Sequence, residues 1–263
     1  MHKINMSNIN IHTDLITEQK ISKKTEKQTK EINKIKVTNI SNKLDQYTII
    51  NFKDITDKNN FKNVQNIFVE ELKQYIKLKK EDTILIIGLG NQKSTPDSLG
   101  PYVVDNILVT RYLFLLGEVE EGYSNVCTFI PNVMGNTGIE TANIVKSIIQ
   151  ETKATKVIII DSLKTTNLNR LNKTIQITNK GISPGSGIYN NRQEISKKTM
   201  NIDVIAIGVP TVVELNNLLE KQYKEKLIVT PTNIDFIIEK LAILIGNGIN
   251  ISLHKNFIRQ NNN

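Results

Sequence analysis

The stretch TILIIG at residues 83–88 is an uninterrupted aliphatic run that ends in a glycine. This pattern is typical of a strand that is buried on both faces, because neither face then carries polar side chains. Two similar runs follow it, KVIIID at 156–161 and DVIAIG at 203–208. Amphipathic stretches of helix length alternate with the runs. The sequence therefore predicts an α/β fold with a mostly parallel, twisted central sheet and flanking helices.

Other stretches predict the remaining elements of this fold. Apolar residues recur near helical spacing in five of them, at residues 64–78, 99–115, 138–150, 211–219 and 233–247. Shorter strands are expected at 47–52 and 126–130. In a parallel α/β sheet, ligands bind beyond the carboxyl ends of the strands. The residues that follow the aliphatic runs are therefore the first candidates for chemistry.

The composition makes several catalytic classes improbable. The 263 residues include one cysteine, Cys127, and three histidines, His2, His12 and His254. A disulfide framework or a Cys-rich zinc site cannot be built from one cysteine. A Ser-His-Asp triad, a Cys-His dyad or an HExxH zinc site would need a histidine from a chain end. A hydrolase of this composition is expected to use carboxylates, a Ser/Lys pair or an oxygen-ligated metal.

Much of the positive charge lies in one segment. The formal net charge is +8, and residues 19–36 alone contain seven lysines and two glutamates. A lysine run without aromatic residues is typical of a solvated or disordered segment, so we expect no direct nucleic-acid binding. No apolar run approaches the ~18 residues that cross a bilayer, and no membrane association is expected. We predict a mobile leader over residues 1–45 and a single α/β domain over 46–263.

Two aspartates follow the first two aliphatic runs. Asp97 lies in the loop after the run at 83–88, and Asp161 ends the run at 156–161. Asp97 could simply begin a helix, and Asp161 could cap a helix or pair with Lys164. If the two strands are neighbours, however, the carboxylates converge, and their pKa values are driven apart so that one holds a proton while the other activates water. The same pair would also suit a hard divalent ion.

Glycine-rich loops lie near these aspartates in the predicted fold. The loop that contains Gly90 and Asn91 carries a G-x-G motif, but Lys93 stands where a dinucleotide fingerprint has its third glycine. Backbone N–H groups of this loop, or of the loop that contains Gly135 and Gly138, are candidate oxyanion donors. A Ser/Lys nucleophile from Ser162 and Lys164 has no supporting motif.

Taken together, the motifs resemble the germination proteases of spore-forming bacteria. The resemblance extends over roughly residues 11–254 and rests on an ordered series of segments. They are HTDL (12–15), GLGN and TPDSLGP (88–101), YVVDNILVTRYL (102–113), VMGNTGIET (133–141), IIIDSL (158–163), NKTIQIT (172–178), GISPGSG (181–187), VIAIGVPTVV (204–213) and VTPTNIDFIIEKLAILIGNGINISLH (229–254).

The resemblance implies a specific activity. The family consists of endopeptidases, treated as an unusual aspartic type, that degrade small acid-soluble DNA-binding spore proteins during germination. It implies a self-processing zymogen whose propeptide, about residues 1–14, ends near Asp14 or Leu15. Its two proposed catalytic aspartates correspond to Asp97 and Asp161. It also implies a fold similar to hydrogenase-maturation peptidases, a homotetramer, a location in the cytoplasm of the spore core and no cofactor.

Two alternative functions remain open from the residues alone. A metal-dependent peptidase of the hydrogenase-maturation type would use Asp97 and Asp161 as ligands of a divalent ion. A non-enzymatic nucleotide-binding module would rest on the motif at residues 88–90 alone. Chelation distinguishes the first alternative, and a ligand-dependent rise in melting temperature distinguishes the second.

Overall fold

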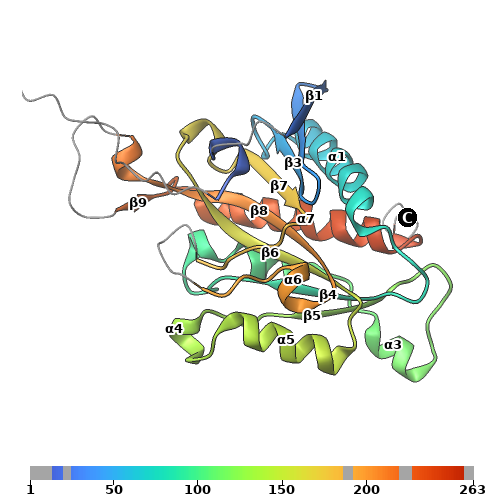
Figure 1. Cartoon of the computed structure of the whole chain (residues 1–263). Helices are drawn as coiled ribbons and strands as arrows, with labels where there is room; N and C mark the ends of the chain where they lie inside the picture. The colour runs from blue at the N-terminus through green and yellow to red at the C-terminus, as the bar shows by residue number, and fades with distance from the viewer. Residues whose placement is uncertain (1–13, 20–24, 186–191, 219–226, 258–263) are drawn as a thin grey trace, which may run out of the picture.

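The computed structural model describes residues 14–19, 25–185, 192–218 and 227–257. Its central feature is one nine-stranded sheet (Figure 1). The strands are β1 (Glu26–Ile32), β2 (Ile35–Ser41), β3 (Gln46–Asn51), β4 (Thr83–Gly88), β5 (Asn125–Phe129), β6 (Lys156–Thr165), β7 (Thr174–Thr178), β8 (Asp203–Glu214) and β9 (Ile228–Val229).

The sheet has a parallel half and an antiparallel half. The strand order is β1-β2-β3-β7-β8-β6-β4-β5, with β9 paired to the end of β8. Strands β5, β4, β6 and β8 are mutually parallel, whereas β1, β2, β3 and β7 form antiparallel pairs up to β8. The predicted α/β class with flanking helices is confirmed, but the sheet is mixed rather than mostly parallel.

Helices cover both faces of the parallel half. The α-helices are α1 (Lys58–Ile76), α2 (Leu99–Val104), α3 (Arg111–Leu116), α4 (Met134–Thr137), α5 (Thr141–Thr152), α6 (Lys197–Met200) and α7 (Ile234–Leu253). Short 3-10 turns are η2 (Ile16–Glu18), η3 (Thr95–Asp97), η4 (Leu168–Arg170) and η6 (Leu215–Asn217). Helices α1, α2 and α7 pack on one face, and α5 and α6 pack on the other (Figure 1).

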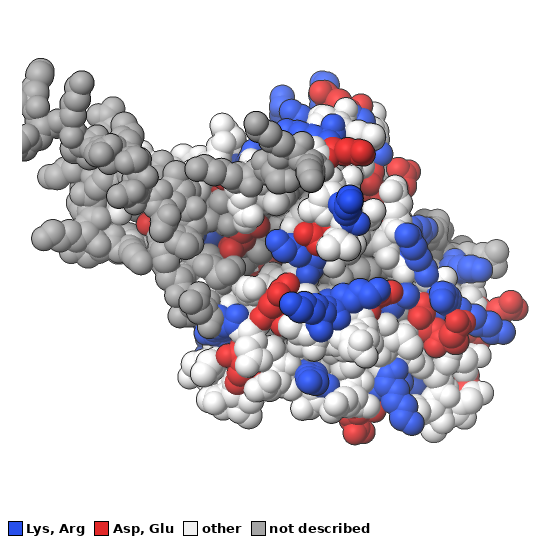
Figure 2. Space-filling model, in the orientation of Figure 1, with Lys and Arg blue, Asp and Glu red and all other residues white. Residues whose placement is uncertain are grey.

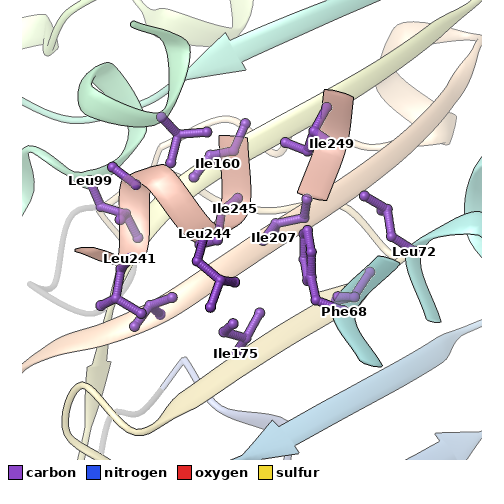
Figure 3. Close-up of a cluster of buried hydrophobic side chains, with 14 of the residues drawn as sticks. Phe68, Leu72, Leu99, Ile160, Ile175, Ile207, Leu241, Leu244, Ile245 and Ile249 are labelled. Carbon is purple, nitrogen blue, oxygen red and sulfur yellow. The ribbon is translucent and has the colours of Figure 1, made fainter. Parts of the chain in front are cut away.

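The aliphatic runs are continuous because successive residues enter two different cores. In β4, Ile84 and Ile86 face the α1/α7 side, while Leu85 and Ile87 face α5. Figure 3 shows the larger core, where side chains of α7 such as Leu244 pack with side chains of α1 and of the strands. Each fully buried side chain of this size contributes about 1.5–3 kcal/mol, so the parallel half forms a stiff platform.

Helix α7 is long and apolar enough to cross a membrane by length and composition. In this fold it packs against α1 and α2 at the centre of the larger core, as expected of a core helix in a globular domain. On the face seen in Figure 2, Lys and Arg side chains are interspersed with Asp and Glu. The positive net charge is therefore not gathered into one patch of that face.

The predicted leader over residues 1–45 is wrong for residues 26–41, which form β1 and β2. Ile35, Val37 and Ile40 of β2 are buried, so this hairpin is part of the domain. Its turn, Asn33-Lys34, has φ values of 50° and 65°, as a type I′ hairpin turn requires. The hairpin escaped prediction because β1 is an edge strand with polar residues on both faces. Residues 1–13 lie outside the described residues.

Two predicted helices also differ from the structure. Residues 211–214 continue β8, because Val213 is buried and pairs with β6 and β9, and the short 3-10 turn η6 follows at Leu215–Asn217. The helix expected over 99–115 is divided into α2 and α3. The other predicted helices and strands are present, with ends shifted by a few residues.

Candidate active site

A cavity of about 470 Å³ lies at the carboxyl ends of β6 and β8. It is bounded by η3, by β6, β7 and β8, and by the segment of residues 14–19. Its lining includes Asp14, Asp97, Asp161, Lys164 and Gln176. The two aspartates proposed as a pair from the sequence thus share one cavity at the predicted edge of the sheet.

Asp161 is buried within β6 and is only 7% exposed. It pairs in register with Gly208 of β8, and one of its carboxyl oxygens accepts a hydrogen bond from the Ser162 backbone N–H at 2.9 Å. Burial raises the pKa of Asp161 well above its ordinary value, and the negative charges of Asp97 and Asp14 raise it further. Asp161 is therefore the member of the pair that most strongly retains a proton.

Asp97 is held at the cavity by the short turn η3. The Thr211 hydroxyl of β8 donates to the Pro96 carbonyl at 2.6 Å, and the Asn91 backbone N–H donates to the Asp97 carbonyl at 2.9 Å. Burial raises the pKa of the Asp97 carboxyl to about 6, although the Asn91 N–H and then Arg192 favour its ionised form. Asp97 is consequently the more acidic of the two aspartates.

The first glycine loop runs from β4 to η3, and the second forms α4 and its end. Gly90 has φ +114°, and a Cβ there would lie 2.0 Å from the Asp97 carbonyl oxygen, so this position requires glycine. The Asn91 N–H is already engaged by Asp97, which argues against an oxyanion role for this N–H. Gly135 in α4 and Gly138 at its end are not among the residues that line the cavity.

The segment Asp14–Gln19 lies against the ends of β6 and β7. Its Asp14 N–H donates to the Lys164 carbonyl at 3.2 Å, and the Lys164 N–H donates to the Asp14 carboxyl at 2.8 Å. Leu15 is fully buried. Ile16 packs against Ile40, Tyr47 and Ile49 on the face of the antiparallel half.

Glu18 anchors the far end of this segment. Its carboxylate accepts hydrogen bonds from the Thr166 backbone N–H at 2.8 Å and from the hydroxyls of Thr165 and Thr166, and it forms an ion pair with Arg170 at 3.2 Å. Of the two residues at the predicted cleavage position, Asp14 lines the same cavity as the two aspartates and Leu15 is buried beside it.

Comparison with known proteins identifies the family. The germination protease family model matches residues 2–222. The chain belongs to the germination protease family. The germination protease of Clostridium acetobutylicum is 36% identical over 84% of this chain and 80% of its own length. That of Geobacillus sp. is 45% identical over 67% of this chain, and that of Bacillus cytotoxicus is 47% identical over the same share.

The chain matches about half the length of the Geobacillus and Bacillus relatives, 46% in each case. Among solved structures, a [NiFe] hydrogenase maturation protease, HycI, from Thermococcus kodakarensis aligns with 68% of this chain and 98% of its own. The sequence identity is 16% and the TM-score is 0.39.

In this member of the germination protease family, Asp161 takes neither of the two structural roles considered from the sequence, pairing with Lys164 or capping a helix. Lys164 is buried, and its amine forms an ion pair with Glu214 at 3.1 Å. Asp161 lies within β6 and caps no helix. Within the described ranges, no group of three or more His, Cys, Asp or Glu side chains is arranged to hold a metal ion.

Sequence reasoning missed two residues that shape the cavity, Gln176 and Thr211. Thr211 fixes η3 to β8 through its hydroxyl, and Gln176 contacts the backbone of the segment at residues 14–16. A signal for Gln176 was present, because it is the polar residue between Ile175 and Ile177 in a short strand. That alternation places it on the opposite face from the larger core.

Proposed function

We propose that this chain is an endopeptidase of the aspartic type, in which Asp97 and Asp161 activate water, and that its own leader is one substrate. The observation that carries the proposal is the position of the predicted cleavage segment. Residues 14–16 line the same cavity as both aspartates, apart from the fully buried Leu15 between them. A peptide bond held there shares its cavity with the candidate general acid and the candidate general base.

The pKa shifts of the two aspartates support an assignment of the roles that the sequence left open. At neutral pH, Asp97, whose pKa is about 6, is mostly ionised, whereas the pKa of Asp161 is raised further by burial and by the charge of Asp97, so Asp161 is the member of the pair that holds the proton more tightly. Asp97 then accepts a proton from the attacking water, and Asp161 donates its proton to the leaving amide nitrogen. Because the two carboxyls interact, they titrate as a pair, and the pair is active when it holds one proton.

Membership of the family extends the proposal to substrates and regulation. We propose that the chain is a zymogen that removes residues up to Asp14 or Leu15, and then degrades small acid-soluble spore proteins in the cytoplasm of the spore core. We further propose a homotetramer that needs no cofactor and does not bind nucleic acid directly. Each of these statements rests on the family resemblance.

The test is cleavage by purified full-length chain. Incubation with a purified small acid-soluble spore protein, followed by mass spectrometry, should show defined fragments together with release of the leader. Asp161→Asn and Asp97→Asn should each reduce cleavage by ~10³-fold or more, as other catalytic deletions do. Asp105→Asn, at an exposed position after α2, is the matched control and should cleave normally. Normal cleavage by either site variant would remove that residue from the mechanism.

A chelator separates this mechanism from the metal-dependent alternative. If two carboxyls and water suffice, prolonged treatment with EDTA leaves the cleavage rate within twofold of the untreated enzyme. Loss of activity that is restored by a divalent cation would instead make Asp97 and Asp161 metal ligands. The measurement is the initial rate of fragment release before and after dialysis.

A further inference from the structure

Three residues lie in one row across the centre of the sheet. Asp161 of β6 pairs with Gly208 of β8, and Gly208 pairs with Gln176 of β7. Residues that pair in register project from the same face, so Asp161 and Gln176 face the cavity from either side of Gly208. Because Gly208 has no side chain, Asp161 and Gln176 face each other across a gap of about two strand spacings, or ~10 Å, and the Leu163 side chain of β6 lies over Gly208 within this gap.

The Gln176 carboxamide forms hydrogen bonds with the backbone of residues 14 and 16, on both sides of Leu15. Its Nε2 donates to the Asp14 carbonyl at 3.2 Å, and its Oε1 accepts from the Ile16 N–H at 2.9 Å. The orientation of the amide follows from its partners, since a carbonyl needs a donor and an N–H needs an acceptor. Gln176 is only 7% exposed, so these bonds form in a largely dehydrated environment.

We propose that Gln176 is a catalytic residue whose side-chain N–H stabilises the oxyanion that forms on the Asp14 carbonyl. The inference rests on the proposed function and on cleavage between Asp14 and Leu15. The donor already contacts the carbonyl oxygen that would become negative, and Asp161 faces the same gap from the other side of Gly208. Preorganised donors of this kind are worth most when they are shielded from water.

The reaction balances with the groups at the site. The water oxygen bonds to the Asp14 carbonyl carbon as Asp97 takes one water proton, and the carbonyl π electrons move onto the oxygen that Gln176 contacts. Collapse of this tetrahedral intermediate breaks the bond between the Asp14 carbon and the Leu15 nitrogen. Asp161 supplies the proton to that nitrogen, so the products are a carboxyl at Asp14 and an amine at Leu15.

This assignment replaces the backbone donors expected from the glycine loops. The Asn91 N–H is committed to Asp97, and Gly135 and Gly138 lie outside the cavity lining. Gln176 comes from the antiparallel half, whereas Asp161 comes from the parallel half. The two halves therefore each contribute a side chain to the cavity in which Asp14 lies.

The test uses two variants of the full-length chain. Gln176→Glu keeps the size and still accepts from the Ile16 N–H, but its carboxylate cannot donate to the Asp14 carbonyl. Gln176→Met keeps the length and adds no charge. For a peptide with the sequence of residues 9–20, both variants should lower kcat by ~10²–10³-fold and leave KM within a few-fold. Gln150→Glu, on the exposed side of α5, is the matched control and should match the parent enzyme.

Three outcomes would overturn the assignment. A parent-like kcat in Gln176→Met would do so, as would a rise in KM with kcat unchanged, because the amide would then only bind substrate. The third is independent of any Gln176 variant. In uncut Asp161→Asn chain, NMR should show slow exchange of the Gln176 side-chain amide protons, and fast exchange would contradict the contact.

Failure of this inference differs from failure of the proposed function. If the aspartate variants lose cleavage but the Gln176 variants do not, only the oxyanion role is wrong. If the parent chain shows no cleavage, or if the aspartate variants cleave normally, the proposed function itself is wrong. Unfolding midpoints in urea for each variant show that the rates compare folded proteins.

Discussion

The two halves of the sheet contribute differently to the candidate site. The parallel half is buried on both faces by α1, α2 and α7 on one side and by α5 on the other, and it supplies Asp161. In the antiparallel half, the face of β2 and β3 that carries Ile40, Tyr47 and Ile49 packs against Ile16 of the leader. That half supplies Gln176 and one part of the surface on which residues 14–19 lie, and the end of β6 supplies another part.

This difference explains how one fold can both raise the pKa values of two aspartates and hold the segment of residues 14–16. Two covered faces exclude water, and exclusion of water raises the pKa of Asp161 and of Asp97. The face of the antiparallel half instead holds residues 14–16, whose backbone is bonded by Gln176 of β7 and, from the end of β6, by Lys164. The cavity lies where the halves meet, beside β8.

The largest expected effect comes from disturbing the loop that attaches Asp97 to the parallel half. Gly90→Ala would place a Cβ 2.0 Å from the Asp97 carbonyl oxygen at φ +114°, so η3 must shift. We expect cleavage to fall ~100-fold or more, since misplacement of about 1 Å can cost that much. Gly117→Ala is the matched control, because Gly117 also has positive φ, +73°, but open space around it.

The control variant should lose about 1 kcal/mol of stability from backbone strain and retain its cleavage rate. The measurements are initial cleavage rates and urea unfolding midpoints for both proteins. Equal activities of Gly90→Ala and Gly117→Ala would show that the position of Asp97 does not depend on this loop.

Sequence reasoning succeeded in the parallel half and failed in much of the antiparallel half. Runs such as residues 156–161 are readable because both faces are buried, and Asp161 stands out as the polar residue that ends such a run. β1 is polar on both faces and resembled a solvated segment, although hydrogen bonding to β2 holds it in the sheet. Gln176 could not be assigned because its role depends on β7 lying beside β8, a pairing that no local pattern encodes.

The next effect concerns the free energy of unfolding as a function of pH. The pKa of Asp97 is about 6 in the folded protein against 3.8 in the unfolded chain, so the folded state binds the proton more tightly. The contribution of Asp97 to the free energy of unfolding is therefore fully present below pH ~4 and is lost as the pH rises through about 6. The loss is of order 1–3 kcal/mol after allowance for partial exposure.

Asp97→Asn removes this proton linkage. Its urea midpoint should equal that of the parent near pH 4 and exceed it at pH 7, while cleavage is lost. Asp105→Asn should follow the parent curve at every pH. Equal changes in the free energy of unfolding between pH 4 and pH 7 in the parent, Asp97→Asn and Asp105→Asn would contradict the raised pKa of Asp97.

The smallest effect tests whether β1 belongs to the domain. Lys30 of β1 forms an ion pair at 2.7 Å with Glu71 of α1, whose side chain is only 2% exposed. Lys30→Met leaves that buried carboxylate without its cation. Since Lys30 is itself half-exposed, we expect a loss of about 1–2 kcal/mol rather than the larger cost of breaking a fully buried pair.

The exposed Lys27 on the same strand gives the control, Lys27→Met, which should stay within about 0.5 kcal/mol of the parent. Equal urea midpoints for the two variants would show that the contact between β1 and α1 does not stabilise the domain, which would then begin near β2, whereas a selective loss in Lys30→Met places the start of the folded domain at or before residue 26.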